Sequence, residues 1–308
     1  MFQCDSTELV GQGSTFDGLK DFVESASRNA SPALLLGEAG TGKELLARTL
    51  HWFSKRRSHP FVVVDCSLYY ECELERELFG IVGAGERHGS RKGLLEFATR
   101  GSCYLSNVEE LSPSLQERLF NYLETGYLQS VGSDKPVSSK VRIFFSSSKC
   151  LQSFTDGGLF SRGLYEQISR LQIEIPPLRV HPEDIQPFVQ QVCVEFARDN
   201  NVRDPQFSGD FWQALETYPW PGNYDELRNE IVRLLRADPA RLTAKSLSTE
   251  IAQYWLGRQS EPEIRRAIEE IEGYIEEFKI MTRLDAEYGE ILLDTSSWSI
   301  SMKDYSRI

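Results

Sequence analysis

The 308-residue sequence lacks the features of metal-binding, disulfide-stabilised and membrane-spanning proteins. Its six cysteines include no C-x-x-C pair and its four histidines have no metal-ligand spacing, so we expect neither a metal site nor a disulfide framework. Cys66 and Cys103 are interpreted as small core residues. No apolar run approaches membrane-spanning length, and the first residues, which include Asp5 and Glu8, do not resemble a signal peptide. These absences predict a soluble, cytoplasmic protein without a membrane partner.

An excess of positive charge is also missing. The formal net charge is −12 and the sequence pI is about 5.0, which argues against broad contact with the phosphate backbone of nucleic acid. Two short basic clusters, Lys55–Arg57 and Arg87–Lys92, are interpreted as solvated loops or subunit contacts. We therefore expect no direct sequence-specific binding to DNA.

The most informative motif is a glycine-rich segment, residues 37–43, which ends in Gly42 and Lys43. It follows an apolar run at 33–36 that predicts a buried strand, and it precedes residues 44–50, which have helical spacing. In this order, loop N–H groups and the helix N-terminus face anionic phosphates, while Lys43 neutralises their oxygens. The sequence thus predicts a P-loop that binds ATP or ADP. The predicted contact residues are Gly37, Glu38, Ala39, Gly40, Thr41, Gly42, Lys43, Glu44 and Leu45.

The groups that ATP hydrolysis needs are not evident. Hydrolysis relies on Mg²⁺ held by an acidic residue, on a group that orients water and on an arginine near the transferred phosphoryl group. The candidate acidic strand, residues 102–105, is followed by Ser106 and Asn107, which carry no charge. Asn107 can orient a water, but it cannot accept a proton as a carboxylate does. Glu109 and Glu110 follow closely, so a shift of register that brings one of them into the site stays open.

The order of elements predicts an α/β protein. Residues 1–178 alternate apolar runs with helical segments, which indicates a parallel sheet with helices on both faces, in three layers. The expected strands are 33–36, 61–64, 103–105 and 141–145, and the expected helices are 16–26, 43–54 and 114–124. Two consecutive prolines within residues 174–178 interrupt this pattern, and we expect a hinge there. Residues 179–245 have helical spacing, with a turn at 220–223 before the last helix, and predict a small helical domain.

The acidic tail, residues 246–308, contains a helical apolar seam. Its members are spaced four, three, four and three residues apart, and they are Ile264, Ile268, Ile271, Ile275 and Phe278. Gly273 weakens this helix. Two interpretations stay open, because such a helix either packs on its own domain or binds a partner or another copy.

Together these motifs resemble one family, the central AAA+ domain of bacterial enhancer-binding proteins, which activate transcription by RNA polymerase that holds sigma-54. The similarity covers roughly residues 8–240. The segments that carry it are Leu9–Gln12, Gly37–Glu44, Glu77–Gly80, Gly126–Pro136, Pro176–Arg179 and Trp220–Asn223. The resemblance implies a P-loop AAA+ fold with a C-terminal helical lid, and it places Val10 and Gly11 near the adenine. It also implies a ring built with AAA+ relatives or with copies of the chain, and contact with the transcription machinery.

The same resemblance implies that the catalytic groups have been replaced. The positions at issue are those of the acid pair, the asparagine that restrains its glutamate, the sensor asparagine, two trans-acting arginines and the sensor arginine. In that order they hold Ser106, Asn107, Asp65, Ser148, Ser161, Gln167 and Asp225. Arg162 and Arg170 lie near the trans-acting positions but out of register, and Arg228 is a candidate substitute one helical turn after Asp225.

Two further family elements are not recognisable. Residues 81–89 do not contain the GAFTGA loop that contacts sigma-54 in the family. From Glu261 onward the sequence shows an acidic heptad helix and no basic recognition helix.

These replacements predict an ATP-binding regulator with impaired or lost hydrolysis and weakly held Mg²⁺. An arginine finger alone is worth about 10³–10⁵ in rate, so the combined losses leave very little catalysis. Such a protein would act by association with partner proteins in transcription regulation. Two alternatives stay open: a slow ATPase that remodels sigma-54 polymerase with shifted residues such as Glu109, Arg162 and Arg228, and a scaffold with a relic P-loop.

Overall fold

The computed structural model describes most of the chain up to residue 259. The described residues are 2–4, 7–9, 13–83, 90–200, 205–237 and 241–259. Two compact units are distinguished, residues 1–252 and 253–308, and every site discussed below lies in the first. Among the described residues no helix is long and apolar enough to cross a membrane. The predicted seam at 264–278 lies outside the described residues.

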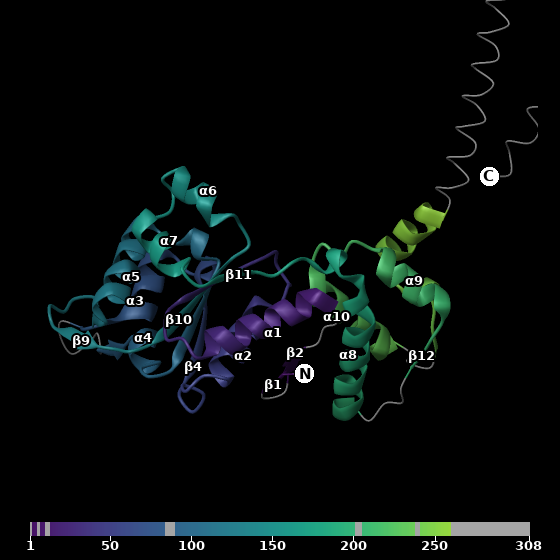
Figure 1. The fold of residues 1–308 in the computed structure, drawn as a ribbon, viewed down its shortest axis with the longest axis horizontal. Helices are drawn as coiled ribbons and strands as arrows, with labels where there is room; N and C mark the ends of the chain where they lie inside the picture. Colours follow the sequence, from purple (N-terminus) through teal and green to yellow (C-terminus); the bar gives the residue numbers. More distant parts are fainter. Residues whose placement is uncertain are drawn as a thin grey trace, which may run out of the picture. The chain divides into compact units, whose positions relative to one another are not determined.

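A five-stranded parallel sheet forms the centre of the first unit (Figure 1). Its strands in spatial order are β11 (Gln172–Glu174), β3 (Ala33–Leu36), β10 (Arg142–Ser147), β7 (Ser102–Ser106) and β4 (Phe61–Asp65). Four of them coincide with apolar runs and were predicted. Strand β11 was missed because it lies at an edge and has only one apolar residue, Ile173, between two polar ones.

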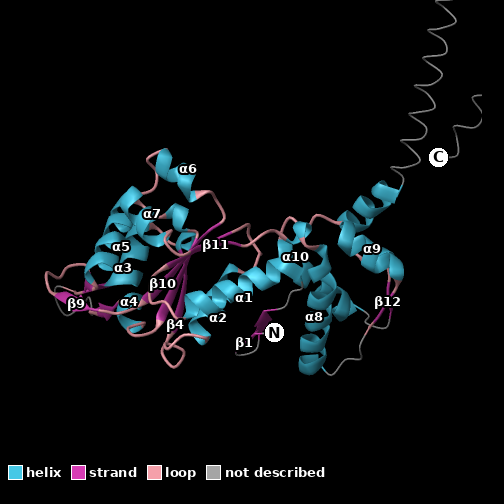
Figure 2. Ribbon diagram, viewed as in Figure 1, coloured by secondary structure: helices cyan, strands magenta, loops and turns pink. Residues whose placement is uncertain are grey.

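Helices cover both faces of this sheet, as Figure 2 shows. Helices α1 (Gly13–Ser27) and α2 (Lys43–Trp52) pack on one face, where they meet Leu35 and Phe144. The opposite face, which holds Leu34, is covered by α3 (Glu71–Phe79), α4 (Leu94–Phe97), α5 (Pro113–Thr125), α6 (Leu151–Asp156) and α7 (Arg162–Ile168). Successive strand residues point to opposite faces, so a fully apolar strand such as β3 contributes to both cores.

The expected core cysteines are buried in this packing. Cys66 is 2% exposed and Cys103 is 0% exposed, and both belong to the core that contains Leu34. Burial raises the pKa of the Cys103 thiol to about 12, so this side chain is a neutral packing group.

Short antiparallel pairs extend from the connections between these elements. They are β1 (Phe2–Cys4) with β2 (Thr7–Leu9), β5 (Gly80–Ile81) with β6 (Arg91–Lys92), and β8 (Tyr127–Gln129) with β9 (Pro136–Ser138). Short 3-10 turns, η1 (Cys66–Leu68) and η2 (Val108–Glu110), follow β4 and β7 at the carboxyl edge of the sheet.

After Ile175 the chain leaves the sheet and becomes helical. The backbone N–H of Ile175 still donates to Leu36, at 2.8 Å, and two prolines follow. The later elements are η3 (Leu178–Val180), η4 (Pro182–Asp184), α8 (Ile185–Asn200), β12 (Gln206–Phe207), α9 (Gly209–Thr217), α10 (Asn223–Ala237), β13 (Arg241–Leu242) and η5 (Ala244–Ser246). Residues 249–259 are also helical. The parallel pair of β12 with β13 is an addition that helical spacing did not predict.

Candidate functional site

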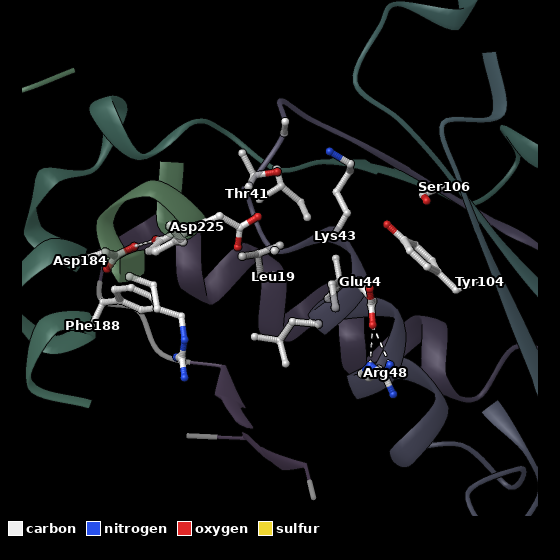
Figure 3. Close-up of a pocket in the computed structure, with 18 of the residues that line it drawn as sticks. Leu19, Thr41, Lys43, Glu44, Arg48, Tyr104, Ser106, Asp184, Phe188 and Asp225 are labelled. Atoms are coloured by element: carbon white, nitrogen blue, oxygen red, sulfur yellow. Dashed lines mark hydrogen bonds and ion pairs between the residues drawn. The ribbon is translucent and has the colours of Figure 1, made fainter. Parts of the chain in front are cut away.

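A cavity of about 620 Å³ lies at the carboxyl edge of the sheet. One wall is the loop that connects β3 to α2, and a second is the ends of β4 and β7. The third wall comes from η4, α8 and α10. Figure 3 shows Lys43 in the middle of the view, with Asp184 and Phe188 on one side of it and Tyr104 and Ser106 on the other.

Two glycines shape the loop. Gly40 has a φ of 73° and Gly42 a φ of 89°, both in the left-handed region that favours glycine. A Cβ atom on Gly40 would lie 2.1 Å from the carbonyl oxygen of Gly222, so no larger residue fits there. Gly42 is the N-cap of α2, and it lines the cavity together with Lys43. The loop N–H groups and the helix N-terminus therefore have the geometry of an anion site.

Lys43 places a positive charge inside this loop. Its Nζ donates to the carbonyl oxygens of Gly37 and Glu38, each at 2.6 Å. Burial lowers the pKa of the Lys43 ammonium, whereas the carboxylates of Glu109, Asp225 and Glu38 act to raise it. The ammonium is thus partly desolvated and faces several carboxylates, a setting in which a phosphate would be a strong competitor for its hydrogen bonds.

The loop is tied to the helical region by hydrogen bonds to three consecutive residues, 38–40. Arg179 donates from Nη1 to Glu38 Oε2 at 2.8 Å and from Nη2 to Oε1 at 2.6 Å. Asn223 Nδ2 donates to the carbonyl oxygen of Ala39 at 2.8 Å, and the N–H of Tyr224 donates to that of Gly40 at 3.0 Å. We call these four bonds the loop clasp.

Asn223 holds the centre of the loop clasp. It is fully buried, has a φ of 51°, and its Oδ1 accepts from the N–H of Leu178 at 2.8 Å. Its Nδ2 also lies 3.3 Å from Glu38 Oε2. The hydrogen bond from Arg179 is the main reason that the pKa of Glu38 falls to about 2, so this carboxylate is ionised at neutral pH.

The end of the cavity next to α8 is aromatic. Phe188 and Tyr224 have ring centroids 4.9 Å apart, and the ring of His181 stacks on Tyr224 at 6.3 Å. His181 Nδ1 lies 3.1 Å from Asp184 Oδ2, which also accepts from the Tyr224 hydroxyl at 3.3 Å. The hydrogen bond to Asp184 raises the pKa of His181. Flat rings with a few fixed polar groups are suited to a planar heterocycle.

The sheet-edge end holds one carboxylate where β4 stops. Asp65 pairs in register with Ser106, and Asn107 Nδ2 donates to Asp65 Oδ1 at 2.8 Å. The N–H and hydroxyl of Ser67 donate to the same oxygen at 3.0 and 2.7 Å. Burial acts to raise the pKa of Asp65, but hydrogen bonds from Ser67 and Asn107 outweigh it and the pKa is lowered. Among the described residues none donates to Oδ2.

A second carboxylate lies behind this edge. Glu109, on η2, is 9% exposed, and its Oε1 accepts from the Ser148 hydroxyl at 3.3 Å. Its Oε2 is buried and has no hydrogen-bond partner in the described part of the chain. Glu110 is more exposed and pairs with Lys149 at 2.8 Å. Of the two glutamates left open by the sequence, Glu109 is therefore the buried one, and its charge acts on Lys43 although it does not line the cavity.

Two known families match successive parts of the chain. The sigma-54 interaction domain family matches residues 9–174, which is more than half of the chain, and the AAA+ ATPase lid domain family matches residues 179–262. The chain belongs to the sigma-54 interaction domain family. The resemblance inferred from the motifs and the predicted α/β fold with a helical lid are both confirmed.

Individual relatives agree with this family. The hydrogenase transcriptional regulatory protein HoxA of Cupriavidus necator is 36% identical over 226 residues, which are 72% of this chain and 46% of HoxA. The HTH-type transcriptional regulatory protein TyrR of Haemophilus influenzae is 32% identical over 277 residues, 88% of this chain and 85% of TyrR. The chain thus spans less than half the length of HoxA, and only 42% of the Salmonella typhimurium TyrR.

A solved structure of the same family shares the fold. NtrX from Brucella abortus, in complex with ADP, superposes with a TM-score of 0.74 and is 30% identical, covering 80% of this chain and 56% of NtrX. NtrX in complex with ATP also gives a TM-score of 0.74, over 79% of this chain and 55% of NtrX.

In this sigma-54 interaction domain, the positions expected to hold trans-acting arginines have structural contacts instead. Ser161 is the N-cap of α7 and accepts from the N–H of Leu164 at 3.4 Å. Gln167 Nε2 donates to Glu124 Oε1 at 2.7 Å. The neighbouring Arg162 lies 3.7 Å from Glu166 on its own helix.

The sensor positions are placed differently. Asp225, in the first turn of α10, lines the cavity, and so does Arg228. Arg228 Nη2 donates to Glu195 Oε2 at 2.8 Å, so its charge is shared with a carboxylate of α8. Val10 and Gly11, the predicted adenine-side residues, lie outside the described residues.

Few of the described side chains of the cavity could bind a divalent metal ion. Among the described residues no group of three or more His, Cys, Asp or Glu side chains converges. The cavity edge offers Asp65, with Ser106 and Asn107 as neutral oxygen donors. Mg²⁺ commonly binds through one carboxylate, substrate phosphates and retained waters, so Asp65 is the side chain that fits it.

The loop clasp was not foreseen from the sequence. Arg179 and Asn223 were noted only as parts of ordered motifs, without a contact to residues 38–40. A Pro-Gly-Asn run before a helix indicates a left-handed turn residue, which Asn223 is. The sequence around Asn223 gives no indication that its side chain binds Ala39, which is 184 residues away.

Proposed function

We propose that the chain is a nucleotide-binding AAA+ regulator with impaired or lost ATP hydrolysis. The observation that carries this proposal is the contrast within one cavity. The loop around Lys43 has the backbone geometry of a phosphate site, whereas the strand end beside it presents Ser106 and Asn107. Binding rests on backbone groups that are present, and hydrolysis needs charged groups that are replaced.

Its ligand is ATP or ADP, with the adenine against the aromatic end and the phosphates on the loop. Support comes from NtrX, which has been solved with each of these nucleotides. Mg²⁺ is bound weakly, because Asp65 is the one carboxylate among the described residues that the ends of β4 and β7 present to the cavity, and hydrogen bonds already occupy one of its oxygens.

The regulator acts by association in transcription, with AAA+ relatives, with copies of itself or with the sigma-54 polymerase. The family, and its relatives HoxA and TyrR, which are transcriptional regulatory proteins, support this role. We place its domain boundaries at residues 1–178, 179–245 and 246–308, since the chain leaves the sheet at the two prolines after Ile175.

One observation favours a second candidate, a slow ATPase with a rebuilt site. Glu109 is buried, has an unpartnered carboxylate oxygen and acts electrostatically on Lys43. A buried acid near a phosphate site is suited to accept a proton from water. Against it, Arg162 and Arg228 are engaged with Glu166 and Glu195.

The test is a calorimetric titration with ATP and with ADP, together with turnover measured on the same sample. We expect binding without turnover above background. Lys43→Ala should weaken binding at least about tenfold, or about 1.4 kcal/mol, because the phosphates then lose their charged partner. The control is Lys55→Ala, which removes an exposed lysine in the turn that follows α2, away from the loop.

Two results would count against the proposal. Turnover that disappears in Lys43→Ala would favour the rebuilt ATPase. If neither wild type nor Lys43→Ala binds a nucleotide, the loop is a relic and the chain is a scaffold.

A further inference from the structure

The cavity has a direction, which fixes where each part of a nucleotide would lie. Phe188 and Tyr224 form the aromatic end, and the loop around Lys43 lies between this end and Ser106 (Figure 3). A nucleotide with its base on the aromatic end and its first two phosphates on the loop points any third phosphate toward the ends of β7 and β4. This orientation rests on the function proposed above.

Three carboxylates lie near the loop and the sheet-edge end of the cavity, to which that third phosphate points. Asp65 lines the cavity and has Oδ2 without a hydrogen bond from the described residues. Glu109 is buried beside Ser148, with Oε2 unpartnered in the same part of the chain. Asp225 lines the cavity from α10, and the described residues give it no ion pair. Glu109 and Asp225 both act electrostatically on Lys43, so their charges reach the loop.

The arginines that line the cavity do not offset these charges. Arg48 donates two hydrogen bonds to Glu44 Oε1, at 2.9 and 2.6 Å. Arg228 is bound to Glu195, and Arg179 of the loop clasp is bound to Glu38. Among the described residues, Lys43 is the cation of this cavity whose hydrogen bonds go to backbone carbonyls alone.

We propose that the cavity selects a nucleoside diphosphate over the triphosphate when no divalent cation is present. A third phosphate adds negative charge near Asp65, Glu109 and Asp225, and the described arginines that line the cavity, Arg48 and Arg228, are already paired with carboxylates. Like charges in a partly desolvated site repel by more than exposed charges do, since water screens them less. The two phosphates of ADP stay on the loop and on Lys43, where donors are available. A divalent cation would offset the repulsion by its positive charge, and Asp65 is the side chain that would hold it.

The experiment measures the dissociation constants of ADP and ATP by calorimetry on the full chain, first in a chelator and then with Mg²⁺. In the chelator we expect ADP to bind at least about tenfold more tightly than ATP. Mg²⁺ should lower the ratio of the ATP dissociation constant to the ADP dissociation constant. Raising the salt concentration in the chelator should also lower it, because ions screen the repulsion.

Variants identify the residues responsible. Asp65→Asn and Glu109→Gln keep the shape of the side chain and remove its charge, and each should move the ratio toward one, with a larger shift in the double variant. Glu117→Gln is the matched control, because Glu117 is exposed on α5 and does not line the cavity. Melting temperatures without nucleotide check that the variants fold. Asp225→Asn, at an exposed position, gives an independent variant if Glu109→Gln does not fold.

Two outcomes overturn this proposal and leave nucleotide binding intact. One is wild-type ATP binding in the chelator that equals or exceeds ADP binding. The other is an unchanged ratio in the folded Asp65 and Asp225 variants. Failure of both nucleotides to bind would overturn the proposed function itself.

Discussion

The loop end and the sheet-edge end of the cavity are built from different parts of the chain. The loop end is made by backbone: glycines with left-handed φ angles, the N-terminus of α2 and the carbonyl groups that the loop clasp holds. The sheet-edge end depends on side chains, and there Ser106 and Asn107 meet Asp65 from the next strand. The fold retains the first end as long as its glycines remain, whereas single substitutions change the chemistry of the second.

The pairing at the sheet edge shows how such a change is accommodated. Asn107 donates to Asp65, so an amide and a carboxylate share one hydrogen bond across two strands. The resemblance expects the reverse, with an amide on β4 and an acid at position 107. The pair thus keeps its hydrogen bond but moves its negative charge one strand away from the loop, since β7 lies between β4 and β10. The contact between the two strand ends is therefore retained although its two residue types are exchanged.

The largest expected effect is on the rate of ATP hydrolysis, when the catalytic residue types of the family are restored at the sheet edge and at the arginine positions. Wild-type turnover should be near background, and Ser106→Asp with Asn107→Glu should recover little, because the new glutamate would face Asp65 at hydrogen-bond distance. Adding Asp65→Asn removes this repulsion, and adding Ser161→Arg and Gln167→Arg supplies the missing cations. The full set should exceed the product of the separate gains, since an arginine finger is worth about 10³–10⁵ only in a complete site.

Steady-state phosphate release at saturating ATP and Mg²⁺ measures this series. Ser161→Arg also removes the N-cap of α7, which costs about 1 kcal/mol, so each variant needs its own melting curve. If the variants gain the same turnover with and without Asp65→Asn, the exchange of amide and carboxylate between positions 65 and 107 is irrelevant to catalysis.

A substitution at Gly40 should disrupt the loop end of the cavity. Gly40→Ala places a Cβ atom against the carbonyl of Gly222 at a left-handed φ, so we expect a loss of more than about 2 kcal/mol in stability. Nucleotide affinity should fall as well, because the loop and α10 must separate. Urea unfolding and calorimetry measure the two effects. Gly18→Ala is the control, since Gly18 lies in α1 with nothing within 4 Å of an added Cβ, and it should stabilise slightly.

A smaller loss is expected when the loop clasp is opened from Asn223. Asn223→Ala leaves the N–H of Leu178 and the carbonyl of Ala39 without their partner in a buried place, which costs about 1–3 kcal/mol. The control Asn121→Ala changes an exposed asparagine of α5. Chemical unfolding of both variants tests the difference, and equal stability would show that the clasp contributes nothing.

The smallest effect is a pH dependence of the same clasp. The pKa of Glu38 falls from 4.5 to about 2 in the folded chain, so its contribution is fully present above pH 4.5 and is lost as pH falls toward about 2. The pair with Arg179 is partly exposed, and we expect at most about 1 kcal/mol. The stability difference between wild type and Glu38→Gln should shrink over this pH range, whereas that for Glu117→Gln should stay constant. A stability difference between wild type and Glu38→Gln that does not change with pH would contradict the lowered pKa of Glu38.

Much of the fold follows from local pattern. The apolar runs at β3, β4, β7 and β10 predicted the central strands, because a strand buried on both faces needs no polar alternation. Strand β11 and helix α3 were not predicted. The three residues of β11 and the acidic start of α3, Glu71, carry little periodic signal, and their positions depend on neighbours distant in sequence.

The sequence by itself determined the phosphate loop, the family and the uncharged residues at 106 and 107, because these are properties of residue type and local order. Only the tertiary structure decided that Asp65 accepts from Asn107, that Glu109 and not Glu110 turns inward, and that Asn223 holds Ala39. Each of these contacts joins residues on separate elements, so it depends on strand order and helix packing. Burial and hydrogen bonding, which set charge and pKa, are properties of that arrangement and leave no mark on the residues' local pattern.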